Sequence, residues 1–86
     1  MNPNTKSSDT LLSLEGHHLE VWKVDGTVYV NYEHSEVKDG MFLRGVFGRG
    51  HDFESACDDY LSQIRGKTLV FNANWGDKRK EVTVLG

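Results

Sequence analysis

The sequence predicts an α+β domain, in which an antiparallel sheet of about five to six strands carries one α-helix across one face. Three observations predict this class: apolar residues at helical spacing within residues 50–67, a hairpin turn at Asp25 and Gly26, and apolar runs of strand length on both sides of the helix. The expected order is β-β-β-β-α-β-β. Residues 1–9 are polar and are expected to form a flexible tail, and residues 10–86 a single domain.

The predicted helix has signals at both ends. Its apolar residues recur with the period of one helical face: Phe53, Ala56, Cys57, Tyr60, Leu61 and Ile64. Asp52 is placed to cap the first turn, and Gly66 supplies the left-handed residue that ends many helices. The sheet is therefore expected to bury this apolar face.

Residues 19–32 form the expected hairpin, and its turn sets the register. Asp25 and Gly26 suit the positive backbone angles of a two-residue turn, so Trp22 is expected opposite Tyr29. One face of the hairpin is the better candidate for the core: Leu19, Val21, Lys23, Val28, Val30 and Tyr32. Trp22 and Tyr29 are then paired on the opposite, outer face.

The remaining strands are predicted from shorter apolar runs, at residues 10–15, 41–48, 68–73 and 81–85, of which the last two form a carboxy-terminal hairpin. Residues 33–40 are polar and are expected to connect two strands. In the run 41–48, placing Arg44 outward places Phe42 and Val46 outward as well. The residues that alternate with them are then expected to face inward: Met41, Leu43 and Phe47.

Composition limits the classes of function. The chain has 86 residues and a formal charge of -3, which favours solubility and steers it toward neither nucleic acid nor an anionic membrane. A single cysteine excludes an internal disulfide, and no apolar run approaches the roughly 20 residues that span a bilayer. These features predict a cytoplasmic protein, and no pattern indicates a cofactor.

The candidate binding surface is the outer face of the sheet. Trp22, Tyr29 and Phe42 are expected there, near Arg44. Exposed rings beside an arginine can stack on unpaired bases or anchor a protein partner. The same face can instead be covered by the amino-terminal strand, by the loop that carries Trp75 or by a second copy of the chain.

Charge is unevenly placed around this fold. Asp58 and Asp59 are expected on the exterior of the helix with Glu54, and residues 78–80 form a basic loop. A solvated surface explains both groups. Alternatively, the acidic face imitates nucleic acid and occupies a basic groove on another protein.

Three further patterns are expected to be structural. Residues 44–51 contain glycines before the helix but lack the spacing of phosphate-binding loops, so Gly48 and Gly50 are expected to loosen the turn. The four histidines show no ligand spacing, so no metal site is predicted. Cys57 is expected to be buried and inert.

The segment FESACDDYLSQIRGKTLVF, residues 53–71, resembles small accessory proteins encoded by bacteriophages and prophages. The resemblance implies a compact protein made in a bacterial cytoplasm, where such proteins often bind or inhibit a host enzyme or defence system. It implies no catalytic residue.

The sequence thus favours a non-enzymatic module that docks to a protein and can associate with itself through the outer sheet face. The alternative is a single-stranded nucleic-acid binder that uses Trp22, Tyr29, Phe42 and Arg44, which the acidic balance disfavours. No paired carboxylates, nucleophile with base or metal-ligand spacing indicates an enzyme.

Overall fold

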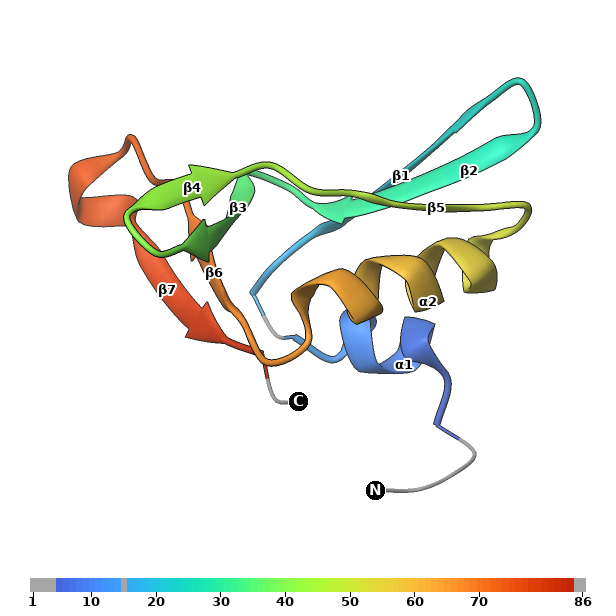
Figure 1. The fold of residues 1–86 in the computed structure, drawn as a ribbon, viewed down its shortest axis with the longest axis horizontal. Helices are drawn as coiled ribbons and strands as arrows, with labels where there is room; N and C mark the ends of the chain where they lie inside the picture. Colours follow the sequence, from blue (N-terminus) through green and yellow to red (C-terminus); the bar gives the residue numbers. More distant parts are fainter. Residues whose placement is uncertain (1–4, 15, 85–86) are drawn as a thin grey trace.

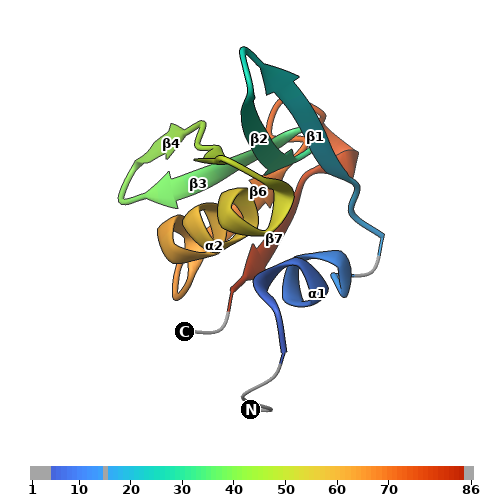
Figure 2. The same ribbon diagram turned by 90° about the vertical axis from the view of Figure 1, so that its right-hand side faces the viewer.

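The α+β class is confirmed by a computed structural model, which describes residues 5–14 and 16–84. Its elements are, in chain order, α1 (Ser7–Leu12), β1 (Leu19–Val24), β2 (Thr27–Tyr32), β3 (Ser35–Asp39), β4 (Phe42–Arg44), β5 (Gly48–Gly50), α2 (Phe53–Ile64), β6 (Thr68–Phe71), η1 (Gly76–Lys78) and β7 (Lys80–Thr83). The strands form two antiparallel sheets, in the orders β1-β2-β5 and β4-β3-β6-β7, and not the single sheet of five to six strands that the sequence predicts (Figure 1). The predicted order β-β-β-β-α-β-β is also wrong, because a helix precedes the first strand and five strands precede α2. α2 packs against β5 and β2, and α1 packs beside α2 (Figures 1 and 2).

The long helix α2 has the predicted bounds and caps. The side chain of Asp52 accepts a hydrogen bond from the backbone N–H of Ser55 at 2.7 Å, and Gly66 has a φ of 78°. Phe53 keeps 37% of its surface exposed. The other members of the predicted apolar face are buried: Ala56, Cys57, Tyr60, Leu61 and Ile64.

The β1–β2 hairpin has the predicted register. Asp25 and Gly26 have φ values of 49° and 83°, as a two-residue turn between twisted strands requires. The core face is predicted correctly near the open end of the hairpin, where Val30 and Tyr32 are buried. Val21, which is expected in the core, is 52% exposed because the turn end extends beyond α2 (Figure 1).

The prediction of a strand at residues 10–15 is wrong, because this segment contains the end of helix α1. The helix begins at Ser7, within the segment predicted as a tail. Ser8 and Leu11 are buried at a helical spacing of three residues. The carboxylate of Glu54 accepts hydrogen bonds from the backbone N–H of Ser8 at 3.0 Å and from its hydroxyl at 2.5 Å. A contact with α2 therefore stabilises α1, and no local pattern predicts it.

The polar connection predicted at residues 33–40 is also wrong. Ser35–Asp39 forms β3, which lies between β4 and β6 in the four-stranded sheet. Val37 is the one apolar residue of this strand and the one that is buried, so the sequence of the strand shows no apolar alternation. Pairing with a strand on each side, rather than its own side chains, makes the segment extended.

The single strand predicted at residues 41–48 is divided between the two sheets. β4 pairs with β3, the chain then leaves that sheet, and β5 pairs with β2. Within β4 the predicted alternation holds, because Phe42 and Arg44 are exposed and Leu43 is partly buried. After the break it is reversed, because Phe47 is 47% exposed whereas Val46 packs against the core. Met41, which is expected to face inward, lies in the turn before β4 and is 98% exposed.

Gly48 and Gly50 belong to a strand pressed against α2 and do not loosen a turn. A Cβ at Gly48 would collide with the carbonyl oxygen of Ala56 and the Cβ of Tyr60. A Cβ at Gly50 would lie 2.6 Å from the Cβ of Ser55. The two glycines therefore allow β5 and α2 to approach at backbone distance.

The carboxy-terminal hairpin is confirmed, with β6 paired to β7 and η1 within the connecting loop. Leu69 and Phe71 of β6 join Tyr32 and Val37 in one core that both sheets share. No helix in the described ranges combines the length and apolar composition needed to cross a membrane.

Candidate interaction surface

The face of the β1-β2-β5 sheet that points away from α2 carries a row of large side chains. Trp22 is opposite Tyr29, and Tyr29 is opposite Arg49, so all three share one face. The rings of Trp22 and Tyr29 are nearly parallel, with centroids 5.5 Å apart and 11° between their planes. The ring of Phe47 meets that of Tyr29 edge-on at 5.6 Å. We call Trp22, Tyr29, Phe47 and Arg49 the aromatic face.

The predicted pairing of Trp22 with Tyr29 is confirmed, but Phe42 does not join them. Phe42 lies on β4 in the other sheet and is 77% exposed. Phe47 takes the position that the prediction gave to Phe42, and it contacts both Trp22 and Tyr29. The aromatic face therefore contains three contacting rings, of which Trp22 and Phe47 are 40% and 47% exposed.

Sequence reasoning misses Phe47 and Arg49, because it treats residues 41–48 as one continuous strand. The available signal is the alternation in residues 47–50, where glycine occupies every second position. A strand with glycine on its helix-facing side presents the intervening side chains together on the other side.

Arg44 lies near this face, as predicted, although it belongs to β4. It lines an open hollow of about 440 Å³ together with Phe47 and Arg49. The carboxylate of Asp59 also lines the hollow and accepts hydrogen bonds from the backbone N–H of Arg49 at 3.0 Å and from the amide of Gln63 at 3.2 Å. Two guanidinium groups and a carboxylate thus give this border both signs of charge.

The acidic exterior of α2 does not form one free surface. Glu54 holds Ser8 of α1, and Asp59 holds the backbone of β5. Asp58 is the member of the predicted acidic face whose side chain is exposed. Two of the three carboxylates therefore also have a structural contact within the fold.

Glu54→Gln is expected to lower the free energy of unfolding by about 1 to 2 kcal/mol. Glutamine has one acceptor oxygen where the carboxylate offers two, and its amide would oppose a donor of Ser8. Urea denaturation measures the change, and Asp58→Asn is the matched control because its side chain is exposed. Equal stability of the two variants would show that Glu54 does not anchor α1.

Cys57 has the structural position predicted for it. It is buried, and this burial, followed by the nearby charges of Glu54 and Asp58, raises the pKa of its thiol to about 11. The thiol is therefore protonated near neutral pH and is a poor nucleophile. Within residues 5–14 and 16–84, no three histidine, cysteine or acidic side chains lie close enough together to hold a metal ion.

Comparisons with known proteins add no functional assignment to this geometry. No family model matches the chain, and no match was found among curated proteins or among solved structures.

Proposed function

We propose that this chain is a non-enzymatic docking module that binds another protein through the aromatic face. The observation that carries the proposal is that three contacting rings, Trp22, Tyr29 and Phe47, share the sheet face opposite α2 and remain partly exposed. Tryptophan, tyrosine and arginine dominate the energetic centres of protein interfaces. The rings of tryptophan and tyrosine supply large contact areas and lose little conformational entropy. A stacked pair is also already ordered before the partner arrives.

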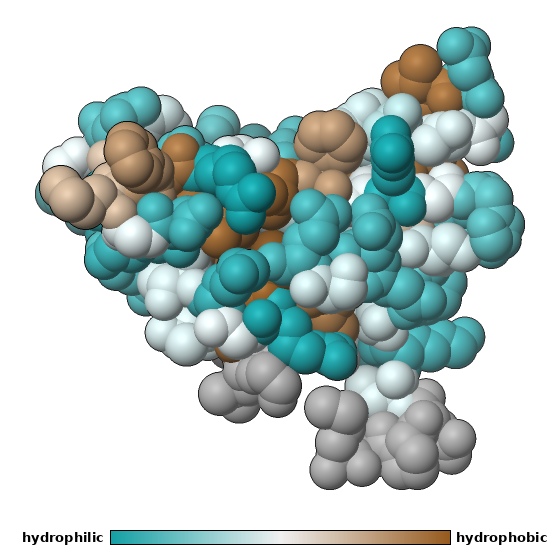
Figure 3. Space-filling model, in the orientation of Figure 1, coloured by the Kyte–Doolittle hydropathy of each residue, from teal (hydrophilic) through white to brown (hydrophobic). Residues whose placement is uncertain are grey.

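A protein partner fits the surroundings of this face better than a nucleic acid does. Val24 is on the same face of the hairpin as Trp22 and is 51% exposed, and Figure 3 shows hydrophobic surface at the hairpin end. Aliphatic side chains extend a protein interface but add little to base stacking. Glu20 lies on the same face as Trp22, and Arg49 lies at the opposite border, so the rim carries both charges. Following the resemblance of residues 53–71, the partner would be a bacterial host enzyme or defence protein.

The test compares the tagged wild-type chain with Trp22→Ala/Tyr29→Ala and with the control Trp75→Ala, which removes an exposed tryptophan elsewhere. We expect the wild type and the control to retain the same protein from a bacterial lysate. The double variant should bind that purified protein roughly 30-fold more weakly, as the loss of about 2 kcal/mol at a central hot spot implies.

Two results would contradict the proposal. One is equal binding by all three versions of the chain. The other is a dimer in sedimentation equilibrium that the double variant abolishes, with no second protein retained, because the face would then belong to a second copy of the chain.

The near-parallel rings of Trp22 and Tyr29, with Arg49 in the same row, also favour single-stranded nucleic acid as a second candidate. Each base stacked on such a ring contributes about 1 to 3 kcal/mol. Titration of a Trp75→Phe variant with an oligonucleotide isolates the fluorescence of Trp22. Quenching that weakens steeply with added salt would support this candidate, and unchanged fluorescence at low salt would reject it.

A further inference from the structure

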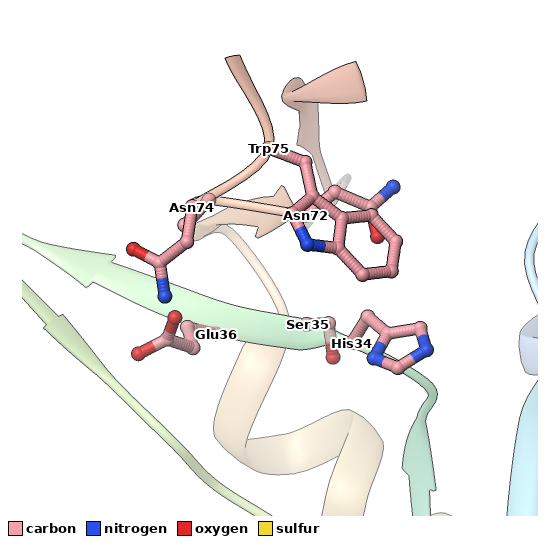
Figure 4. Close-up of a pocket in the computed structure, with 7 residues that line it drawn as sticks. His34, Ser35, Glu36, Asn72, Asn74 and Trp75 are labelled. Atoms are coloured by element: carbon pink, nitrogen blue, oxygen red, sulfur yellow. The ribbon is translucent and has the colours of Figure 1, made fainter. Parts of the chain in front are cut away.

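A polar pocket lies at the end of the four-stranded sheet, where two turns meet (Figure 4). His34, Ser35 and Glu36 line it from the start of β3, and residues 72–75 line it from the loop after β6. Its volume is about 320 Å³, and it shares no residue with the aromatic face. Pockets that hold small ligands begin at about 300 Å³, so this one has room for a single ring.

The two turns are held in a defined arrangement by backbone hydrogen bonds. The N–H of Asn72 donates to the carbonyl of His34 at 2.9 Å, and the N–H of Trp75 donates to the carbonyl of Asn72 at 2.9 Å. His34 and Asn72 both have left-handed backbones, with φ values of 58° and 55°. Both are residue types that adopt this conformation in turns. The hydrogen bond between Asn72 and His34 joins the two turns, so the walls of the pocket are fixed relative to each other.

The lining places a flat ring at one end and polar groups at the other. Trp75 is 54% exposed, and its indole lies beside the ring of His34 with centroids 5.3 Å apart. In Figure 4 the carboxylate of Glu36 and the amide of Asn74 extend toward each other away from these rings. This end of the pocket therefore offers a strong acceptor beside a group that both donates and accepts.

These groups distinguish among ligand classes. No lysine or arginine lines the pocket, and the carboxylate of Glu36 would repel a phosphate. A lone carboxylate is also a poor site for a divalent metal ion, which requires several oxygen ligands. Each hydroxyl group of a sugar can both donate and accept a hydrogen bond. Two neighbouring hydroxyl groups could therefore donate to the carboxylate of Glu36 and exchange hydrogen bonds with the amide of Asn74. The C–H face of a pyranose ring is apolar and flat enough to lie on an exposed indole.

We propose that this pocket binds one pyranose ring of a neutral saccharide. The apolar face of the sugar lies on the indole of Trp75, and two adjacent hydroxyl groups bond to Glu36 and Asn74. The pocket is open to solvent and contacts one ring only, so the dissociation constant for a monosaccharide is expected to be about 1 mM.

The experiment is an NMR titration of the ¹⁵N-labelled chain with methyl glucoside, methyl galactoside and methyl mannoside, each up to about 50 mM. The indole N–H of Trp75 and the side-chain amide of Asn74 report on the pocket, and the indole N–H of Trp22 is the internal control. We expect saturable shifts of the first two signals with at least one glycoside, and none of the third. Trp75→Ala should abolish the Asn74 shifts, and Glu36→Gln should weaken binding about tenfold.

Three outcomes would overturn this assignment. The first is the absence of any shift at Trp75 and Asn74 with all three glycosides. The second is shifts of the Asn74 amide that persist unchanged in Trp75→Ala, a variant expected to keep the fold because Trp75 is 54% exposed. The third is a larger saturable response to guanosine than to every glycoside, which would mean that the pocket binds a nucleobase. Thermal denaturation of each variant checks that a lost signal does not come from unfolding.

Discussion

Gly48→Ala is expected to destabilise the domain severely, although it adds a single methyl group. The new Cβ would meet the backbone carbonyl oxygen of Ala56 and the Cβ of Tyr60, both in α2. The backbone of a helix cannot rotate away as a long side chain can, so β5 and α2 would have to separate along their contact. We expect the free energy of unfolding to fall by about 3 kcal/mol or more, at the upper end of costs for overpacked cores.

Thermal denaturation followed by circular dichroism measures this effect. A domain of this size loses roughly 4 to 8 °C in midpoint for each kcal/mol, so a decrease of roughly 12 °C or more is expected. Gly45→Ala is the matched control, because its added Cβ would have no atom within 4 Å apart from those of its own chain neighbours. Its midpoint should stay within about 3 °C of the wild type. Similar midpoints for the two alanine variants would contradict the close packing of β5 on α2.

The elements predicted correctly from sequence are those whose signals are local. The helix Phe53–Ile64 has an apolar face, an Asp52 cap and Gly66 within one continuous segment. The hairpin has its register set by Asp25 and Gly26 alone. In both cases neighbouring residues specify the geometry, so no knowledge of the rest of the fold is needed.

The elements missed are those that distant residues specify. Glu54 stabilises α1 from 46 positions away, and β3 is extended because strands pair with both of its edges. β5 has no apolar side chain at all, and its place is decided by the fit of two glycines against α2. A pattern of hydrophobic residues cannot report such contacts, because the deciding groups are hydrogen bonds and the absence of a side chain.

The candidate sites follow the same division. Trp22 and Tyr29 could be placed together because the turn sets their register, whereas Phe47 depends on where the chain changes sheets. The polar pocket beside Trp75 could not be predicted, since it forms only where the turn at His34 meets the loop at Asn72. These turns are far apart in the sequence, so no local motif can indicate the pocket.

The hydroxyl of Tyr60 completes the hydrogen bonding of β2 beyond the first residue of β5, where the pairing of these two strands stops. The last pair between these strands is Val30 with Gly48, so the backbone N–H of Tyr32 has no partner from β5. The phenol oxygen of Tyr60 accepts this N–H at 3.1 Å, and the phenol of Tyr32 donates to the carbonyl of Leu11 at 2.7 Å. Burial raises the pKa of Tyr60, so the phenol remains neutral. One side chain of α2 thus supports β2, and β2 in turn supports α1.

Tyr60→Phe is expected to reduce the free energy of unfolding by about 1 to 3 kcal/mol, because it leaves the N–H of Tyr32 buried without an acceptor. The ring and its edge contact with Tyr32 are retained, so the change reports on the hydroxyl. Urea denaturation measures the loss, and Tyr29→Phe, on the partly exposed aromatic face, is the control that should change stability by less than about 0.5 kcal/mol. Hydrogen exchange adds a local readout, since the amide of Tyr32 should lose protection more than that of Val30. Unchanged stability together with unchanged protection at Tyr32 would mean that the phenol of Tyr60 does not hold the end of β2.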